Sequence, residues 1–179
     1  MNSFNVRDLI ISALMTSLIC VGAFIKIPLF VVPVTMQFFF VNFSIVYQSR
    51  KYAAMTILTY IILGLIGLPV FSGGGGPSYI FMPTFGYIIG FFLASVVSGT
   101  VKRYLGESLK SNLLLSLINI FIIYFCGVFY FYFLSNFYLG NQIEILRLLV
   151  VGCLIFIPSD TISGILSSLL SVRIKKCLK

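Results

Sequence analysis

The chain has 179 residues, of which 60% are hydrophobic and only 9% are charged, and its formal net charge is +8. Soluble domains carry roughly 25% charged residues, so this composition excludes an ordinary soluble protein and predicts an all-α integral membrane protein. The absence of histidine excludes histidine-based catalytic triads and imidazole metal sites, and we expect no metal site.

At about 20 residues per span, residues 1–179 have room for six or seven helices in a single transmembrane domain. The first helix is predicted over 9–25, where a long apolar run follows a polar start. It ends before 26–33, a connection that contains two prolines and cannot continue the helix. The second helix is predicted over 34–47 and is short.

The third helix is predicted over 52–68, and four consecutive glycines follow it within a loop at 71–83. Each glycine inside a helix costs about 1 kcal/mol relative to alanine, so residues 73–76 are not helical. The phosphate-binding pattern GxxxxGK[ST] is absent here, and a flexible lid or a close-packing loop is predicted instead.

Three further helices are predicted over 84–101, 112–134 and 145–172, which brings the total to six. The last of them contains Pro158, which should kink or unwind it locally.

Lysine and arginine are distributed unequally between alternate connections. Ten of the twelve fall at the N-terminus, the 48–52 turn, the 102–111 loop and the C-terminal tail, whereas Lys26 and Arg147 fall on the other side. The positive-inside rule therefore predicts that both termini are cytoplasmic. Cationic edges that face anionic lipid account for the net charge without any nucleic-acid partner.

Asp160 is the one acidic residue within an apolar segment, at 155–163. An ionisable group there is costly and suggests a functional site. Asp160 could pair with a nearby hydroxyl or cap the half-helix after Pro158. Proton coupling is disfavoured, because no second buried carboxylate or histidine could pass the proton on, and ligand binding is favoured. Gln37 offers an amide to a polar ligand or faces water at a helix end.

Small residues recur every four positions on three predicted helices, which lets helices approach closely in lipid. Internal packing is the simplest interpretation, and the alternative is that one such stripe faces a partner protein. The stripes are Gly86, Gly90, Ala94 and Ser98; Ser159, Ser163, Ser167 and Ser171; and the pair Ala13 and Ser17. Most of the many aromatic residues are predicted to face lipid, and a few are predicted to line a ligand pocket.

Four segments together resemble the BioY family, the biotin-specific S components of energy-coupling-factor (ECF) transporters. Residues 33–37 (PVTMQ) resemble its PxTxQ element, and 64–71 (GLIGLPVF) resemble the GxxGLPVF segment that precedes a glycine-rich loop. Residues 83–91 (PTFGYIIGF) resemble its PTxGYxxGF stretch, and 158–160 (PSD) fall where the family has a small residue followed by aspartate. The resemblance covers nearly the whole chain in the correct order.

The resemblance implies the six-helix ECF S-component fold in a bacterial plasma (inner) membrane, multi-pass, and no enzyme or cofactor. Such a subunit captures biotin from the outer side, and a transmembrane coupling subunit with two ATPase subunits drives uptake. By resemblance, Asp160 would contact the ureido ring of biotin, and a small-residue pair on the first helix would dock the coupling subunit. The other expected site residues are Gln37, Thr35, Tyr87, Thr84, Gly74 and Ser163, and the docking pair is Ala13 and Ser17.

The chain departs from the family at Ser163, where many members have a lysine that is available to the biotin carboxylate. Lys26 or Arg147 could substitute for it, or the ligand preference could be shifted. An S component for another small vitamin and a stand-alone membrane facilitator therefore remain alternatives. An enzyme is disfavoured because one buried carboxylate without histidine leaves few acid–base pairs. A purely structural scaffold would need neither the glycine loop nor Asp160.

Overall fold

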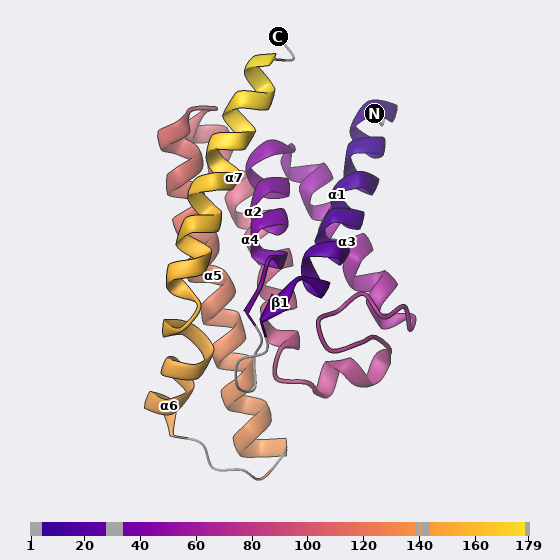
Figure 1. Cartoon of the computed structure of the whole chain (residues 1–179), viewed down its shortest axis with the longest axis vertical. Coiled ribbons are helices and arrows are strands. Elements are labelled where there is room, and N and C mark those ends of the chain that lie inside the picture. The colour runs from indigo at the N-terminus through magenta and orange to yellow at the C-terminus, as the bar shows by residue number, and fades with distance from the viewer. Residues whose placement is uncertain (1–4, 28–33, 139, 141–143, 178–179) are drawn as a thin grey trace.

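A computed structural model of the chain describes residues 5–27, 34–138, 140 and 144–177. Within these residues the helices are bundled along one long axis, and the two ends of the chain lie at the same end of the bundle (Figure 1). The predicted all-helical class is confirmed. Four described helical segments are long and apolar enough to cross a membrane, and these are Val6–Phe24, Phe85–Leu105, Leu109–Tyr138 and Leu146–Cys177.

The first helix, α1 (Val6–Phe24), begins at Asn5, whose side chain accepts a hydrogen bond from the backbone N–H of Arg7 at 3.1 Å. This is an N-cap, which satisfies one of the unpaired N–H groups of the first turn. One face of α1 is buried against α2 (Gln37–Tyr47) and α3 (Arg50–Leu65), and the opposite face is exposed.

A two-stranded hairpin follows α1, although the sequence predicted only an irregular connection. Strand β1 (Lys26–Ile27) pairs antiparallel with β2 (Val34–Thr35), and Lys26 lies opposite Thr35. Pro28 and Pro33, which supported that prediction, lie outside the described residues. The predicted start of the second helix at residue 34 is wrong, because residues 34 and 35 form β2 and the helix begins at Gln37.

Helix α2 passes through the middle of the bundle and packs against α1, α4 and α7. Its 11 residues extend about 17 Å, well short of the ~30 Å hydrocarbon core of a bilayer. Eight of these residues are buried, so neighbouring helices rather than lipid surround its backbone. Helix α2 can therefore be short, because its ends are enclosed by protein.

After α3 the chain forms the glycine-rich loop, which includes the short 3-10 helix η1 (Pro77–Phe81). The loop folds back onto the end of α3, where the N–H of Gly76 donates to the carbonyl of Gly64 at 2.7 Å. Phe71 and Gly74 exchange two backbone hydrogen bonds of 2.9 and 3.1 Å, which close a tight turn. The ring of Phe71 is buried against Tyr60 and Tyr79. The loop is thus closely packed, as one of the two predicted alternatives proposed.

The structure explains why glycine occupies consecutive positions in this loop. Gly74 and Gly76 have φ values of +123° and +107°, which side-chain-bearing residues rarely adopt. Gly75 has no positive φ, but a Cβ atom there would lie 2.0 Å from the carbonyl oxygen of Leu68. Two of the three positions are therefore fixed by backbone conformation and one by lack of space.

We expect Gly75→Ala to displace the loop from the end of α3, because the added methyl group meets backbone that cannot move aside as a side chain would. The expected loss of loop stability is about 1–3 kcal/mol, the usual cost of overpacking. Limited proteolysis or hydrogen exchange of the detergent-solubilised protein would detect increased opening at 71–83. Gly73→Ala is the matched control, because its Cβ would meet only the Tyr79 ring, at 3.3 Å. If residues 71–83 were equally protected from proteolysis or exchange in both variants, lack of space would not be the reason for glycine at position 75.

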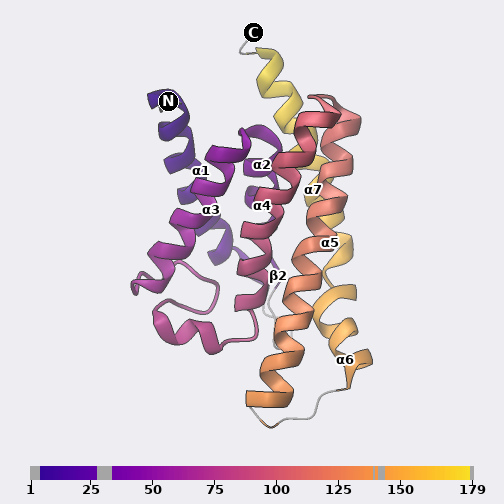
Figure 2. The same cartoon turned by 180° about the vertical axis from the view of Figure 1, so that it is seen from behind.

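Helices α4 (Phe85–Leu105) and α5 (Leu109–Phe133) form the most extensive contact in the bundle, and a π-helical turn, η2 (Leu134–Tyr138), extends α5. Figure 2 shows them side by side on the back of the molecule.

The small-residue stripe of α4 allows this contact. Cβ atoms at Gly86 and Gly90 would lie 2.3 Å from the Cβ of Tyr130 and 2.8 Å from the Cα of Ile123. For α4, the predicted internal packing is confirmed.

The predicted last helix is divided into three parts: α6 (Ile145–Leu149), the π-helical turn η3 (Val150–Leu154) and α7 (Ile157–Cys177). The break at residues 155–156 ends two residues before Pro158, so the predicted local unwinding is confirmed. Proline lies in the first turn of α7, where its missing N–H would have had no partner within the helix.

A buried hydrogen-bond network fixes α7 against α2, α4 and α5. The Nδ2 of Asn42 donates to Ser116 at 2.7 Å and to Ser167 at 2.6 Å. Asn119 donates to the Oδ1 of Asn42 at 2.7 Å, and Ser98 donates to Asn119 at 2.6 Å. Polar side chains that bond across helices in this way hold membrane bundles together.

Candidate functional site

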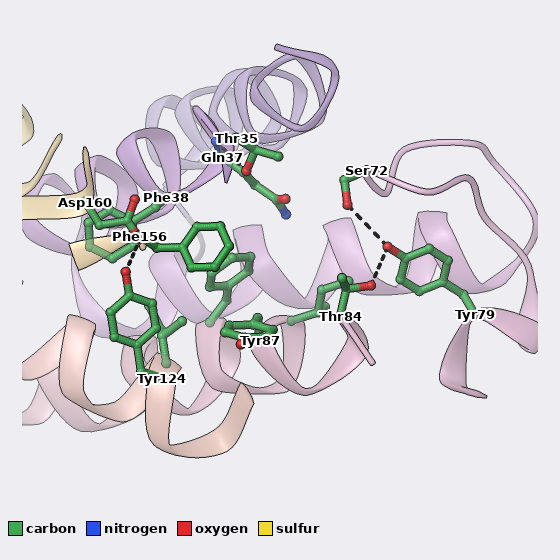
Figure 3. A pocket seen from close by; sticks show the side chains of 13 residues that line it. Thr35, Gln37, Phe38, Ser72, Tyr79, Thr84, Tyr87, Tyr124, Phe156 and Asp160 are labelled. Carbon is green, nitrogen blue, oxygen red and sulfur yellow. Dashed lines mark hydrogen bonds between the residues drawn. The ribbon is translucent and has the colours of Figure 1, made fainter. Parts of the chain in front are cut away.

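A pocket lies in the half of the bundle that contains the hairpin and the glycine-rich loop (Figure 3). Its walls come from strand β2, from helices α2, α4, α5 and α7, from the glycine-rich loop and from the break before α7. The lining residues are Thr35, Gln37, Phe38, Ser72, Tyr79, Thr84, Tyr87, Ile88, Phe91, Ile123, Tyr124, Phe156 and Asp160. Five of the expected site residues are therefore brought together from three separate segments of the sequence.

Asp160 lies at one end of this pocket, in the first turn of α7, and is only 8% exposed. Its Oδ2 accepts a hydrogen bond from the hydroxyl of Tyr124 at 2.7 Å, and its Oδ1 accepts one from Ser159 at 3.4 Å. Because the chain breaks before Pro158, the carboxylate lies in the first turn of α7, near the N-terminal end of a helix dipole. The expected pairing with a hydroxyl is present, and it occurs at a pocket-lining position.

The other polar end of the pocket is formed by three hydroxyl groups. Tyr79 shares a hydrogen bond of 2.9 Å with Thr84 and one of 3.4 Å with Ser72. Figure 3 shows this chain of hydroxyls on the opposite side of the pocket from Asp160 and Tyr124. Ser72 and Tyr79 belong to the glycine-rich loop, so the shape of that loop determines where this polar end lies.

Apolar side chains line the pocket between its two polar ends. They are Phe38, Ile88, Phe91, Ile123 and Phe156. Pockets of this kind, mostly apolar with a few convergent polar groups, are typical of small-molecule sites.

Tyr87 contributes its ring to the lining while its hydroxyl is used elsewhere. The hydroxyl donates to the carbonyl of Gly152 in η3 at 2.7 Å. The ring fits because α5 has no side chain at Gly127, where a Cβ atom would lie 2.4 Å from it. Tyr87 therefore also links α4 to the π-helical turn that precedes the break, and π-helical turns are frequent near functional sites.

Gln37 is buried. The interpretation that it faces water at a helix end is therefore wrong, and its amide is available at the pocket. Its Nε2 donates to the hydroxyl of Tyr60 at 2.8 Å, and Tyr60 in turn donates to the carbonyl of Val70 at 3.2 Å. The hydroxyl of Thr35, at the start of the same segment, accepts from the N–H of Gln37 at 3.4 Å. The amide is thus held in a fixed position at the pocket wall.

Two of the expected site residues lie outside the pocket lining. Gly74 forms the tight turn of the glycine-rich loop, and Ser163 is half-buried on α7, almost one turn beyond Asp160. Tyr124 is a lining residue that the sequence analysis missed, although its hydroxyl donates to the carboxylate of Asp160 at 2.7 Å. A tyrosine hydroxyl inside a membrane helix needs a hydrogen-bond partner, and that is the signal that could have identified it.

The pair Ala13 and Ser17 does not pack inside the described part of the chain. Both residues are exposed on α1, on the face turned away from its neighbours, and the hydroxyl of Ser17 bonds to the carbonyl of Ala13 at 3.1 Å. The large apolar side chains around them, Ile10, Leu14 and Leu18, are exposed as well. This stripe therefore differs from that of α4, which is buried.

Comparison with known proteins relates the whole chain to one family. A model of the BioY family matches residues 1–179. The probable biotin transporter BioY of Lysinibacillus sphaericus is 38% identical over 173 residues, which cover 96% of this chain and 88% of that protein. The biotin transporter BioY of Thermotoga maritima is 38% identical over 171 residues, or 95% of this chain and 96% of that protein.

A solved structure extends the likeness to three dimensions. The S-component for biotin from an ECF-type ABC transporter superposes with a TM-score of 0.86 at 28% identity. The superposition covers 98% of this chain and 94% of the other.

Proposed function

The chain belongs to the BioY family, and we propose that it is the biotin-binding S component of an ECF-type ABC importer. It is a multi-pass membrane protein and a transporter subunit rather than an enzyme. The observation that supports biotin as the ligand most directly is the buried carboxylate of Asp160 at one end of a mostly apolar pocket.

The chemistry of biotin matches the two polar ends and the apolar middle of this pocket. The ureido ring offers two N–H groups, and a carboxylate such as Asp160 would accept them in charge-assisted hydrogen bonds. The thiophane ring and the aliphatic chain are apolar and suit the walls formed by Phe38 and Phe156. Beyond Asp160, we propose direct contact for the other expected residues of the lining, which are Gln37, Thr35, Thr84 and Tyr87.

We further propose that both termini are cytoplasmic, in the plasma (inner) membrane of a bacterium, with residues 1–179 forming a single transmembrane domain. The termini lie at the same end of the bundle (Figure 1). Ten of the twelve lysine and arginine residues belong to the two terminal segments, the 48–52 turn and the 102–111 loop, which the sequence assigns to the cytoplasmic side. There, Lys102 donates to the carbonyls of Val46 and Gln48, and Lys175 pairs with Glu107. The pocket lies toward the opposite end, where biotin would enter from outside.

Energy for uptake would come from partner subunits, because the sequence carries no ATP-binding motif. We propose a transmembrane coupling subunit and two ATPases as these partners. The exposed Ala13–Ser17 face of α1 supports this, because small residues on an unpartnered helix face allow another membrane helix to approach closely.

Purified protein in detergent is expected to bind radiolabelled biotin with a dissociation constant well below micromolar, and to discriminate against other vitamins. Equilibrium binding with competition by a panel of unlabelled vitamins measures both properties. Micromolar or weaker affinity for biotin, together with tighter binding of another vitamin, would support an S component of different specificity. Biotin uptake into liposomes that contain this chain alone would favour a stand-alone facilitator.

A further inference from the structure

The pocket offers a carboxylate but no cation to its ligand, as far as its lining is described. Asp160 is the single charged residue among the lining side chains, and the opposite end presents only the hydroxyls of Ser72, Tyr79 and Thr84. Removing water from the carboxylate of an anionic ligand such as biotin is costly, and a nearby cation offsets this cost better than neutral donors do. A residue just beyond the lining could supply that charge.

Lys26 lies beside the hydroxyl end of the pocket. Its Nζ donates a hydrogen bond to the backbone carbonyl of Ser72, a lining residue. The hairpin also places Lys26 opposite Thr35, which is another lining residue. The hairpin register is extended by a hydrogen bond of 3.0 Å from the N–H of Met36 to the carbonyl of Ile25. Two lining residues from separate segments are thus the immediate neighbours of this lysine.

We propose that Lys26 binds the carboxylate of biotin, which fixes the orientation of the ligand with its ureido ring at Asp160 and its tail toward Ser72. This inference rests on the proposed function. The ammonium group is exposed and bonded to a neutral carbonyl, so it can exchange that partner for a carboxylate. The new bond is charge-assisted and therefore stronger than the one it replaces.

The other candidate residues do not belong to the lining of the pocket. Arg147, the other cation expected on the outer side, is exposed on α6 and is not part of the lining. Ser163, three residues after Asp160 on α7, carries no charge and is not part of the lining. Lys102 is bonded to the carbonyls of Val46 and Gln48 at the opposite end of the bundle. Lys26 is therefore the cation that the described structure places at the pocket.

The test compares biotin with biotinamide, whose tail has the same shape but no charge, for the wild-type protein and for Lys26→Met. We expect Lys26→Met to weaken binding of biotin by about tenfold, at the lower end for a hydrogen bond to a charged group because the site is exposed. Binding of biotinamide should stay within about twofold of the wild type. Higher ionic strength should weaken biotin binding to the wild type and have little effect on the variant.

The control variants are Arg147→Met, which removes the other outer-side cation and should bind biotin normally, and Lys26→Arg, which should keep most of the affinity. Equal weakening of biotin and biotinamide by Lys26→Met would show that the lysine only holds the loop, and would overturn the proposal. Unchanged affinity for biotin would overturn it as well. If the wild-type protein binds neither ligand, the proposed function itself fails, an outcome that is distinct from both.

Discussion

Asp160→Asn is expected to weaken biotin binding by about 1.5–3 kcal/mol, or roughly 10- to 150-fold in Kd. Asparagine has the same shape as aspartate and can still accept the hydrogen bond that Tyr124 donates to Oδ2 at 2.7 Å. It removes the negative charge and one of the two acceptor atoms that would meet the ureido N–H groups. The loss should therefore appear in ligand affinity and leave the fold intact.

Equilibrium binding of radiolabelled biotin measures this loss, and thermal unfolding in detergent shows whether the variant is folded. Ser163→Ala is the matched control, because Ser163 is on the same helix but outside the lining, and it should bind like the wild type. Tyr124→Phe should have a smaller effect than Asp160→Asn, since it keeps the carboxylate and removes only its neighbour. If a well-folded Asp160→Asn protein binds biotin normally, Asp160 serves only to start α7.

Ala13→Leu and Ser17→Leu are expected to abolish assembly with the coupling subunit while leaving biotin affinity unchanged. Both positions are exposed on α1, and neither belongs to the lining of the pocket. A helix that packs against small residues approaches closely, and a leucine at either position would hold it away. Co-purification of a tagged coupling subunit with each variant, after co-expression, measures assembly directly.

Leu117→Phe on α5 is a suitable control for these two variants. Leu117 is 58% exposed, and its replacement enlarges a lipid-facing side chain without touching α1. Its complex should co-purify as the wild type does. A complex that survives leucine at both Ala13 and Ser17 would mean that the coupling subunit binds another face.

The helices could be predicted from the sequence because apolar runs alternate with prolines, glycines and charged turns. The break before Pro158 was predictable for the same reason, since proline acts through backbone geometry that does not depend on its surroundings. The hairpin was not predictable: its strands have two residues each, which is too short for any periodic pattern.

The pocket was only partly predictable. Polar residues in apolar segments, such as Asp160 and Gln37, are conspicuous because burying them is costly. Tyr124 was not, because α5 contains several tyrosine and phenylalanine residues and its sequence does not show which of them meets the pocket. Ser72 and Tyr79 reach the pocket through the path of the glycine-rich loop, and the sequence specified only that this loop is not helical.

The Asn42 network has a consequence for the order in which the protein is assembled in the membrane. Asn42 lies near the middle of α2, an early helix, but its amide bonds to Ser116, Ser167 and Asn119, which are synthesised later. In lipid, an amide without these partners is costly. Helix α2 is therefore synthesised before the hydrogen-bond partners of Asn42 exist. All the hydrogen bonds of the Asn42 amide can form only when α7, the last helix, has been translated and has packed beside α2.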